Sequence, residues 1–218
     1  MNMKLFTAGG TPFPPVGSYQ KKSKRTYLKR LYDQRYIQKE LYRQIKANDV
    51  ILLSMRLPYY FGGTYYVPKK DYRFLKEDGS FLSRENHFND WISAVANLAN
   101  MAQKQGAKII IQTPTPEWEK EKNKLCSTAN IQWFNRLQKR DCQIKSKFFI
   151  DEETGLYKNL FEKLNQLSSS HENIYLFDTY KVVCPGRTCS FIMDGVEIYA
   201  DTDHISYGWA RDYLSLEI

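Results

Sequence analysis

Residues 50–55 read Val-Ile-Leu-Leu-Ser-Met, and this short apolar run is the strongest indication of fold class in the chain. Its apolar residues are continuous rather than alternating with polar ones, which is typical of a strand buried in a parallel sheet. A similar run, Lys-Ile-Ile-Ile-Gln-Thr, occupies residues 108–113. A third run, Ile-Tyr-Leu-Phe, occupies residues 174–177, and residues 4–7 predict a further brief strand. The chain is therefore expected to contain several strands of the buried parallel type.

Amphipathic stretches lie between these runs and predict crossover helices. In residues 24–47 apolar side chains recur at every fourth position, which indicates a helix with one buried side. Residues 83–105 also hold helical spacing and begin with a serine suited to capping a helix. Further helices are predicted over residues 154–168 and after Ile205. Residues 58–79, rich in Tyr, Gly and Lys, are interpreted as a loop over the sheet.

Strands and helices thus alternate, which predicts an α/β fold with three layers, α/β/α, around a parallel sheet. No linker-like stretch divides the 218 residues, so a single domain is expected over residues 1–218. In open sheets of this kind, ligands bind at the C-terminal ends of the strands. These ends are expected at Gly9 and Gly10, at Arg56, at Thr113 and at Asp178.

The composition fits a packed domain. Hydrophobic residues make up 42% of the chain and charged residues 26%, which argues against a disordered segment. No run of 18 apolar residues is present, so no membrane span is expected. The first residues have only a very short apolar stretch before Gly and Pro, so no signal peptide is expected either.

The net charge of +8 is concentrated in one segment. Ten Lys or Arg and two acidic residues lie between Lys21 and Lys46, a balance of eight positive charges that equals the net charge of the chain. A basic helix of this kind can follow phosphates or an anionic membrane surface, but a solvated outer face of a core helix has the same composition. Both interpretations stay open. No DNA- or RNA-binding signature accompanies the segment, so no nucleic-acid partner is expected.

Four cysteines form two local pairs, Cys126 with Cys142 and Cys184 with Cys189. An even number is compatible with two disulfides in an oxidising compartment, but also with four separate thiols in the cytosol. Between Cys184 and Cys189 a Pro-Gly turn can bring the two Cα atoms within bonding range. Zinc binding is disfavoured, because neither pair has the two-residue spacing of zinc ligands and no histidine is near either pair.

The most informative segment for chemistry is Tyr-Ala-Asp-Thr-Asp-His-Ile-Ser, residues 199–206. Asp201 precedes His204 by three residues, in a turn that leads into the last predicted helix. At this spacing the carboxylate can accept a hydrogen bond from the imidazole and fix its tautomer. The other ring nitrogen is then left as a general base for a serine. Asp201 and His204 are therefore the candidate acid and base of a catalytic site.

The sequence also offers other roles for its histidines. Asp203 beside His204 could form a metal-binding pair, but no third ligand is apparent. His87, inside a predicted helix, and His171, in a polar stretch, are interpreted as structural or solvated. No metal and no cofactor is expected.

The sequence DTDHISYGWA, residues 201–210, resembles the last conserved block of the SGNH hydrolases. More of the chain is similar to one branch of that family, the SGNH domain fused behind the membrane acyltransferase-3 domain of bacterial O-antigen and polysaccharide O-acetyltransferases. The similar stretches are TAGGTPFPP (residues 7–15), DVILLSMRLPYYF (residues 49–61) and IIIQTPTPEW (residues 109–118). Together with the cysteine pairs, the resemblance covers nearly the whole chain.

This resemblance implies roles for individual residues. Asp201 is implied as the acid of a catalytic triad and His204 as its general base. Gly9 or Gly10 lies where the family supplies an oxyanion-hole backbone N–H. Arg56 stands where other SGNH enzymes carry Gly-x-Asn-Asp, so it is expected either to donate to the oxyanion or to form a surface salt bridge.

One family feature is missing from the chain. The nucleophilic serine of the family belongs to a Gly-Asp-Ser block that ends the first strand, and no Gly-Asp-Ser occurs among the 218 residues. The opening of the chain matches the family's second strand, so the first strand and its serine are expected upstream of Met1. Ser18 and Ser54 are the nearest alternatives. Neither is expected on a strand-to-helix turn that would aim its hydroxyl at His204.

The implied function is O-acyl transfer through an acyl-serine, with acetyl as the expected group and a cell-surface polysaccharide, such as lipopolysaccharide, as the carbohydrate acceptor. The implied partner is a membrane acyltransferase domain, upstream or in the same operon, on the periplasmic or extracytoplasmic side. The cysteine pairs are implied to be disulfides there. Without its serine the chain alone is expected to be inactive. Two alternatives remain: a carbohydrate esterase, and a non-catalytic domain that binds glycan or anionic partners.

Overall fold

The computed structural model describes residues 12–16, 18–19, 24–61, 74–76, 78–118, 126, 142–145, 149 and 157–213. The chain divides into two compact units, which are described in turn. The first contains most residues up to 112 together with 160–177, and the second contains chiefly 113–159 and the residues from 178 onward.

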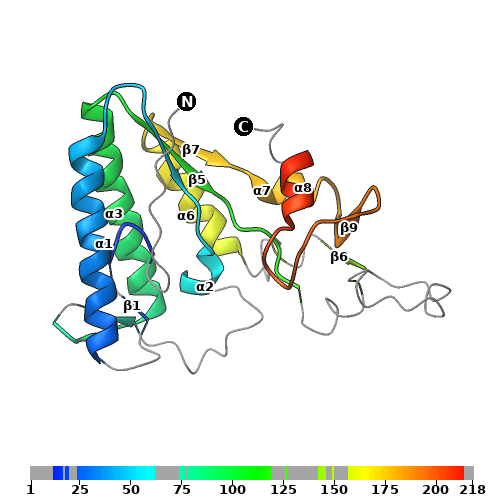
Figure 1. The fold of residues 1–218 in the computed structure, drawn as a ribbon, viewed down its shortest axis with the longest axis horizontal. Coiled ribbons are helices and arrows are strands. Elements are labelled where there is room, and N and C mark those ends of the chain that lie inside the picture. Colours follow the sequence, from blue (N-terminus) through cyan, green and yellow to red (C-terminus); the bar gives the residue numbers. More distant parts are fainter. Residues whose placement is uncertain are drawn as a thin grey trace. The chain divides into compact units, whose positions relative to one another are not determined.

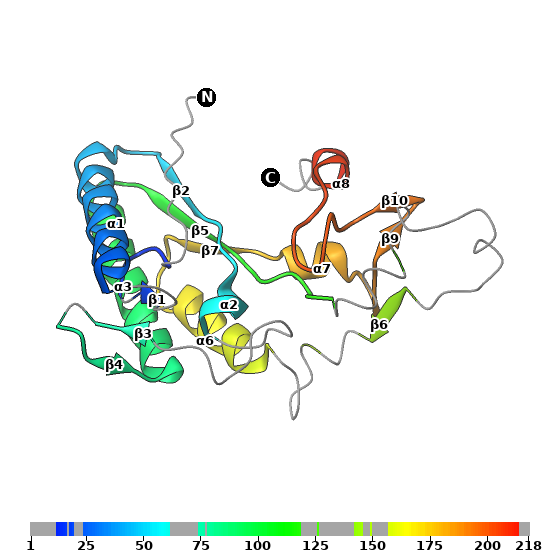
Figure 2. The same cartoon turned by 60° about the horizontal axis from the view of Figure 1, so that its bottom comes forward.

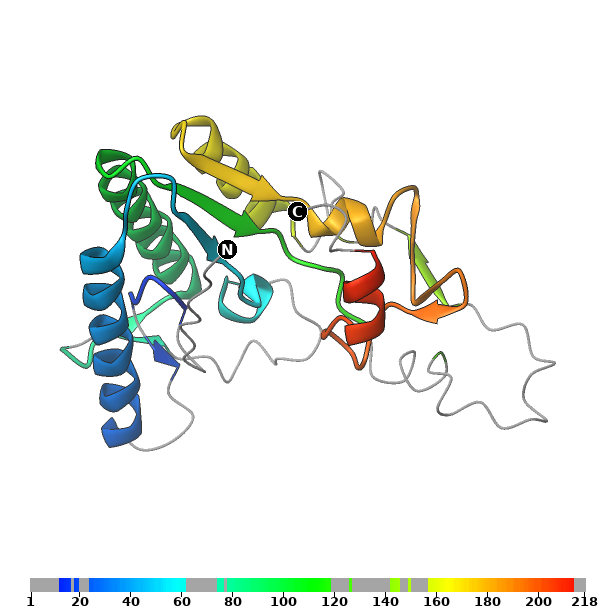
Figure 3. The same cartoon turned by 45° about the horizontal axis from the view of Figure 1, so that its top comes forward.

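A parallel sheet forms the centre of the first unit. Its three strands are Val50–Leu53 (β2), Lys108–Gln112 (β5) and Ile174–Phe177 (β7). They are arranged in the order β2-β5-β7 and run in the same direction (Figures 1 and 3). The α/β fold class and the parallel sheet are thereby confirmed, and each strand lies in one of the apolar runs that predicted it.

Helices precede and connect the strands of this sheet. They are Lys24–Gln44 (α1), Leu57–Phe61 (α2), Arg84–Lys104 (α3) and Lys158–Ser169 (α6). The predicted capping serine is confirmed, because the Ser83 hydroxyl accepts the backbone N–H of Asn86 at 3.1 Å. Between α1 and β2 the chain turns at Asn48, whose φ of 68° is a left-handed conformation that Asn tolerates better than most residues. The α6 helix begins four residues later than the predicted 154–168 helix.

The helices pack against one face of the sheet. On β2 and β5, Ile51 and Ile109 point into a buried core that also contains Trp91 and Leu98 of α3 and Leu164 of α6. These side chains alternate with residues on the other face, as the two-residue period of a strand requires. The core of the first unit therefore lies between the sheet and its helices.

The opposite face of the sheet carries apolar side chains that remain exposed within the described residues. Leu52 pairs with Ile110, which pairs with Tyr175, so the three side chains form a row across the strands. Leu52 is 54% exposed and Tyr175 is 46% exposed. The continuous apolar run at residues 50–55 predicted burial on both faces. Within the described part of the chain the burial alternates, because the described helices cover one face.

The interpretation of residues 58–79 as a loop is corrected in part. The short helix α2 lies at its start, where Phe61 stacks on Phe88 with ring centroids 4.7 Å apart. Strand Phe74–Leu75 (β3) lies further along and pairs with Ser18–Tyr19 (β1) and Phe81–Leu82 (β4). Tyr60 and Phe61 are thus buried in the packing, which the Gly- and Tyr-rich composition of the segment did not predict. The strand predicted at residues 4–7 lies outside the described residues.

Within its described residues, the second unit contains short strands and two short helices. The strands are Gln143–Lys145 (β6), Thr188–Ser190 (β8), Ile192–Met193 (β9) and Val196–Glu197 (β10), and the helices are Thr179–Val183 (α7) and Tyr207–Asp212 (α8). Strand β6 pairs with β8 in antiparallel fashion. Strands β9 and β10 also form an antiparallel pair (Figure 2). The β9–β10 turn contains Asp194 and Gly195, both with positive φ, the chemistry expected of a tight hairpin.

Both predicted disulfides are present in the second unit. Cys126 is bonded to Cys142, and Cys184 to Cys189. The second bond joins the end of α7 to β8, and both of its cysteines are buried. Among the described residues, no helix combines the length and apolarity needed to cross a bilayer.

Candidate active site

A short loop between β10 and α8 carries the predicted acid–base pair, and backbone hydrogen bonds hold it closed. The backbone N–H of Ala200 donates to the carbonyl of His204 at 2.8 Å, and Tyr199 and Ile205 form an antiparallel bridge. The carbonyl of Thr202, at the tip of the loop, accepts the backbone N–H of Trp118 at 2.7 Å. The loop is thus held at its base and at its tip.

A buried aromatic cluster lies beneath this loop. Trp118, Phe191 and Tyr199 are fully buried, with ring centroids between 5.3 and 5.8 Å apart. Two of the three contacts are edge-on and the third is stacked, which are favourable aromatic geometries. Burial raises the pKa of Tyr199 above its usual range, so this tyrosine stays neutral. Since Tyr199 precedes Asp201 by two residues, the cluster fixes the start of the loop.

The far end of the loop is fixed by the cap of α8. The Ser206 hydroxyl accepts the backbone N–H of Trp209 at 3.2 Å and donates to the carbonyl of Glu197 in β10. Ser206 therefore satisfies one of the free N–H groups of the helix and also ties α8 to the β9–β10 hairpin. Trp209 is fully buried, which fixes the helix in place.

Asp201 accepts three hydrogen bonds from residues just after it. Its Oδ1 accepts the backbone N–H of Asp203 at 3.0 Å and that of His204 at 2.8 Å, and its Oδ2 lies 2.7 Å from Nδ1 of His204. Partial burial acts to raise the pKa of Asp201. The two backbone hydrogen bonds and the imidazole together outweigh it, and they hold the pKa of this carboxyl below its usual value. Asp201 is thus an ionised acceptor at neutral pH.

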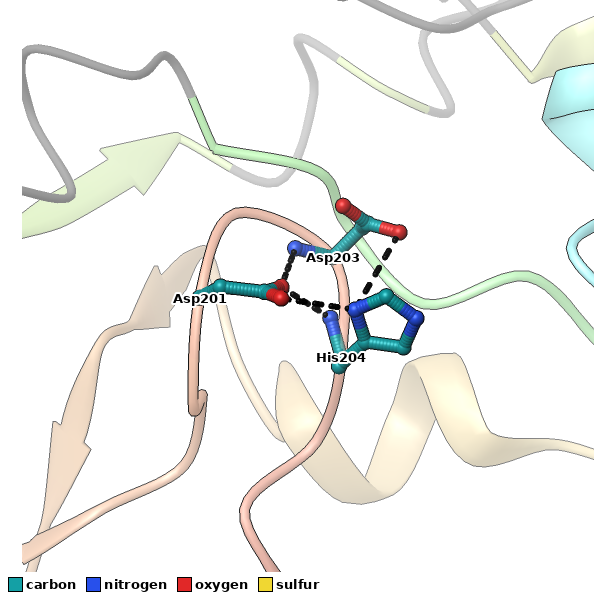
Figure 4. A group of neighbouring side chains, drawn as sticks. All are labelled: Asp201, Asp203 and His204. Carbon is teal, nitrogen blue, oxygen red and sulfur yellow. Dashed lines mark hydrogen bonds and ion pairs between the residues drawn. The ribbon is translucent and has the colours of Figure 1, made fainter.

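Asp201 orients the imidazole of His204. Its Nδ1 faces Asp201, whereas Nε2 points away from both neighbouring carboxylates (Figure 4). The side chain is 73% exposed within the described residues. Donation from Nδ1–H to Asp201 selects the tautomer whose lone pair is on Nε2, which is the arrangement of a general base. The hydrogen bond predicted from the Asp-x-x-His spacing is confirmed.

Asp203 places a second carboxylate near the same ring nitrogen. Its Oδ2 lies 3.8 Å from Nδ1 of His204, and its Oδ1 accepts the hydroxyl of Thr202 at 2.8 Å. Asp201, Asp203 and His204 each offer one ligand atom, all within 4.8 Å of one another, so Asp201 is the third metal-ligating group that was not apparent in the sequence. The Asp201–His204 hydrogen bond explains the arrangement without an ion.

Arg56, Gly9 and Gly10 are the other residues that the sequence predicted for the site. Arg56 follows β2 in the first unit, with its guanidinium carbon 5.5 Å from the ring centroid of Tyr59. Because the acid–base pair belongs to the second unit, the oxyanion role of Arg56 stays a prediction. Gly9 and Gly10 lie outside the described residues, so their expected role stays a prediction as well.

The structure places the two alternative serines in different surroundings. Ser54 lies between β2 and α2, so it does stand on a strand-to-helix connection, contrary to the expectation. Its hydroxyl donates to the side-chain oxygen of Gln112 at 2.6 Å. Ser18 belongs to β1, where it pairs with Leu75. That neither serine is catalytic stays a prediction.

The other two histidines lie in structural surroundings, as predicted. His87 is fully buried in α3, with its ring 5.3 Å from that of Phe61. His171 is half-buried, and its Nδ1 lies 3.0 Å from the Ser170 hydroxyl and 3.1 Å from the carbonyl of Leu167.

Sequence reasoning did not identify the residues that support the loop. Trp118 stands 84 positions before Thr202, and nothing in the local sequence indicates that their backbones meet. The only available signal was a tryptophan shortly after a strand end, in the stretch Pro116-Glu-Trp118.

Comparisons with known proteins identify one family. The family model described as the SGNH domain fused to AT3 domains matches residues 1–212. No curated protein and no solved structure matches the chain.

Proposed function

Because the chain belongs to the family of SGNH domains that are fused to AT3 domains, we propose that it is the acyl-transferring domain of a membrane-bound O-acyltransferase. The observation that carries this proposal is the Asp201–His204 hydrogen bond, in which Nδ1 faces Asp201 and Nε2 points away from it. An acid–base pair of this geometry suits the transfer of an acyl group through a serine. The proposed acceptor is a hydroxyl of a cell-surface polysaccharide, and the proposed group is acetyl.

In the proposed reaction His204 moves protons in both half-reactions. Nε2 takes the proton of the serine hydroxyl while the serine oxygen bonds to the acyl carbon, and it then returns that proton to the leaving group of the donor. In the second half, Nε2 takes the proton of a sugar hydroxyl, whose oxygen bonds to the acyl carbon. The serine oxygen leaves and receives that proton. Asp201 stabilises the imidazolium that forms in each half.

The serine is proposed to come from a segment outside these 218 residues, in which no Gly-Asp-Ser occurs. Two observations support this proposal. Within the described residues, β2 pairs along one edge only, with β5. The apolar side chain of Leu52 on this strand is more than half exposed, as expected where a further strand and its helix would pack. On this proposal the 218-residue chain alone is inactive.

The proposed location is the extracytoplasmic side of the membrane, next to the AT3 membrane acyltransferase domain that characterises the family. The two disulfides support it, since disulfides persist in oxidising compartments. The carbohydrate acceptor would meet the domain on the same side.

The test compares two forms of the protein with a small aryl acetate as substrate. One is the 218-residue chain, and the other is the chain extended by the in-frame residues encoded upstream of Met1. We expect hydrolysis only from the extended form, provided that the extension contains Gly-Asp-Ser. Loss of one member of a catalytic triad lowers turnover by about 10⁴- to 10⁶-fold.

His204→Ala and the serine-to-alanine variant should each abolish the activity of the extended form, whereas His171→Ala should leave it unchanged. Incubation with a polysaccharide acceptor should then yield acetylated glycan. If hydrolysis persists unchanged and no glycan is acetylated, the esterase alternative is correct. Hydrolysis by the 218-residue chain that depends on His204 would overturn the proposal of an external serine.

A further inference from the structure

The outward side of α1 carries a stripe of cations and tyrosines that has no part in the proposed reaction. Its members are Lys29, Tyr32, Tyr36, Lys39 and Arg43, and all five side chains are exposed. They are spaced alternately three and four residues apart, so they follow one another along a single side of the helix. With a rise of 1.5 Å per residue, the stripe is about 21 Å long.

The two tyrosines are the unusual members of this stripe. Tyr32 is 58% exposed and Tyr36 is 66% exposed, although the same helix buries Leu31 and Gln34. Neighbouring exposed aromatic rings are not needed for the core. Tyrosine is enriched where a surface meets the headgroup layer of a bilayer, because its ring is apolar and its hydroxyl is polar.

The charge around the tyrosines has one dominant sign. The segment from Lys21 to Lys46 holds ten basic and two acidic residues, and this balance of eight equals the net charge of the whole chain. Arg43 is 3.1 Å from Glu40, which lies beside the stripe. Cations that flank exposed aromatic rings along a helix are the arrangement that binds anionic lipid headgroups.

We propose that this stripe of α1 docks the domain onto an anionic phospholipid surface. Domains of this family are fused to AT3 membrane domains, so a lipid bilayer would lie close to the stripe. The proposal is independent of the proposed acyl transfer, since it uses none of the residues of the Asp201–His204 loop. Docking would keep the domain close to the bilayer in which its membrane partner lies.

The test measures co-sedimentation of the 218-residue chain with vesicles of 30% phosphatidylglycerol and 70% phosphatidylcholine, and with vesicles of phosphatidylcholine alone. We expect binding to the anionic vesicles that weakens as salt rises, because screening shortens the reach of surface charges. Each basic residue near the surface is worth roughly fivefold in affinity, so Lys29→Glu combined with Lys39→Glu should weaken the binding by at least about 25-fold.

A matched control variant changes the net charge by the same amount, at residues outside α1. Lys145→Glu with Arg187→Glu changes two exposed side chains of the second unit and lowers the net charge by the same amount, so it should weaken binding much less. Tyr32→Ser with Tyr36→Ser keeps the net charge and should still reduce binding. All variants should keep the thermal unfolding midpoint of the parent, since every changed residue is exposed.

Three results would overturn the proposal. Equal loss of binding in the two charge variants would show that net charge alone is responsible. Equal binding to neutral and anionic vesicles would show that the cations are not involved. Binding to a soluble acidic polysaccharide but not to vesicles would assign the stripe to glycan recognition instead.

Discussion

The two disulfides should stabilise the protein to different extents, and the difference follows from the chain length that each bond closes. Cys126 and Cys142 are 16 positions apart, whereas Cys184 and Cys189 are 5 apart. In the chain-entropy model the loss of unfolded-state entropy grows with the logarithm of loop length. At 25 °C the model gives about 3 kcal/mol for the longer loop and about 2 kcal/mol for the shorter one.

The perturbation is replacement of each pair by alanine in separate variants, with protein prepared under oxidising conditions. Thermal unfolding followed by circular dichroism should show a midpoint lowered by about 6–12 °C without Cys126–Cys142 and by about 4–8 °C without Cys184–Cys189, at about 2–4 °C per kcal/mol for a chain of this size. Reduction of the parent protein by a thiol reagent should lower its midpoint as well. A larger loss from the shorter loop, or no loss from either, would refute the entropic reasoning.

Three further predictions concern the site loop and the exposed sheet face. Because the pKa of Asp201 is lower in the folded chain than its usual value near 4, this group contributes stability that is complete above pH 4 and is lost as the pH falls through the folded pKa. Urea midpoints measured between pH 6 and pH 2 should therefore fall less steeply for Asp201→Asn than for the parent, and identical slopes would contradict this. Ser206→Ala removes the cap of α8 and should lower the free energy of unfolding by about 1 kcal/mol, whereas Ser169→Ala at the exposed end of α6 should change it little. Leu52→Thr on the exposed face of β2 should reduce aggregation in light scattering without lowering the unfolding midpoint, and unchanged aggregation would show that this face is not the cause.

The parts of the structure that sequence reasoning predicted well are those with local causes. The strand at residues 174–177 and the helix capped by Ser83 follow from apolar spacing and capping chemistry. The Asp201–His204 hydrogen bond follows from a three-residue spacing within one turn. In each case the residues that form the structure are neighbours in the chain, so a local sequence pattern is enough to predict it.

The parts that were missed depend on distant residues. Helix α2 forms in a Tyr-rich segment because Phe61 packs against Phe88 and Trp91, which lie in α3. The site loop is held by the backbone of Trp118, from a different part of the chain. No local spacing rule indicates either contact, because tertiary packing overrides the propensity of a short segment.

The measurement that tests the central claim most directly is the tautomer of His204, read by long-range ¹H–¹⁵N correlation NMR at pH 8. If Asp201 holds the ring as a base, the neutral imidazole carries its proton on Nδ1 and leaves Nε2 unprotonated. Asp201→Ala should then shift the tautomer towards Nε2–H, while the tautomer of His171 should not change. A parent protein in which His204 carries its proton on Nε2, with no response to Asp201→Ala, would contradict the assignment of this pair as acid and base.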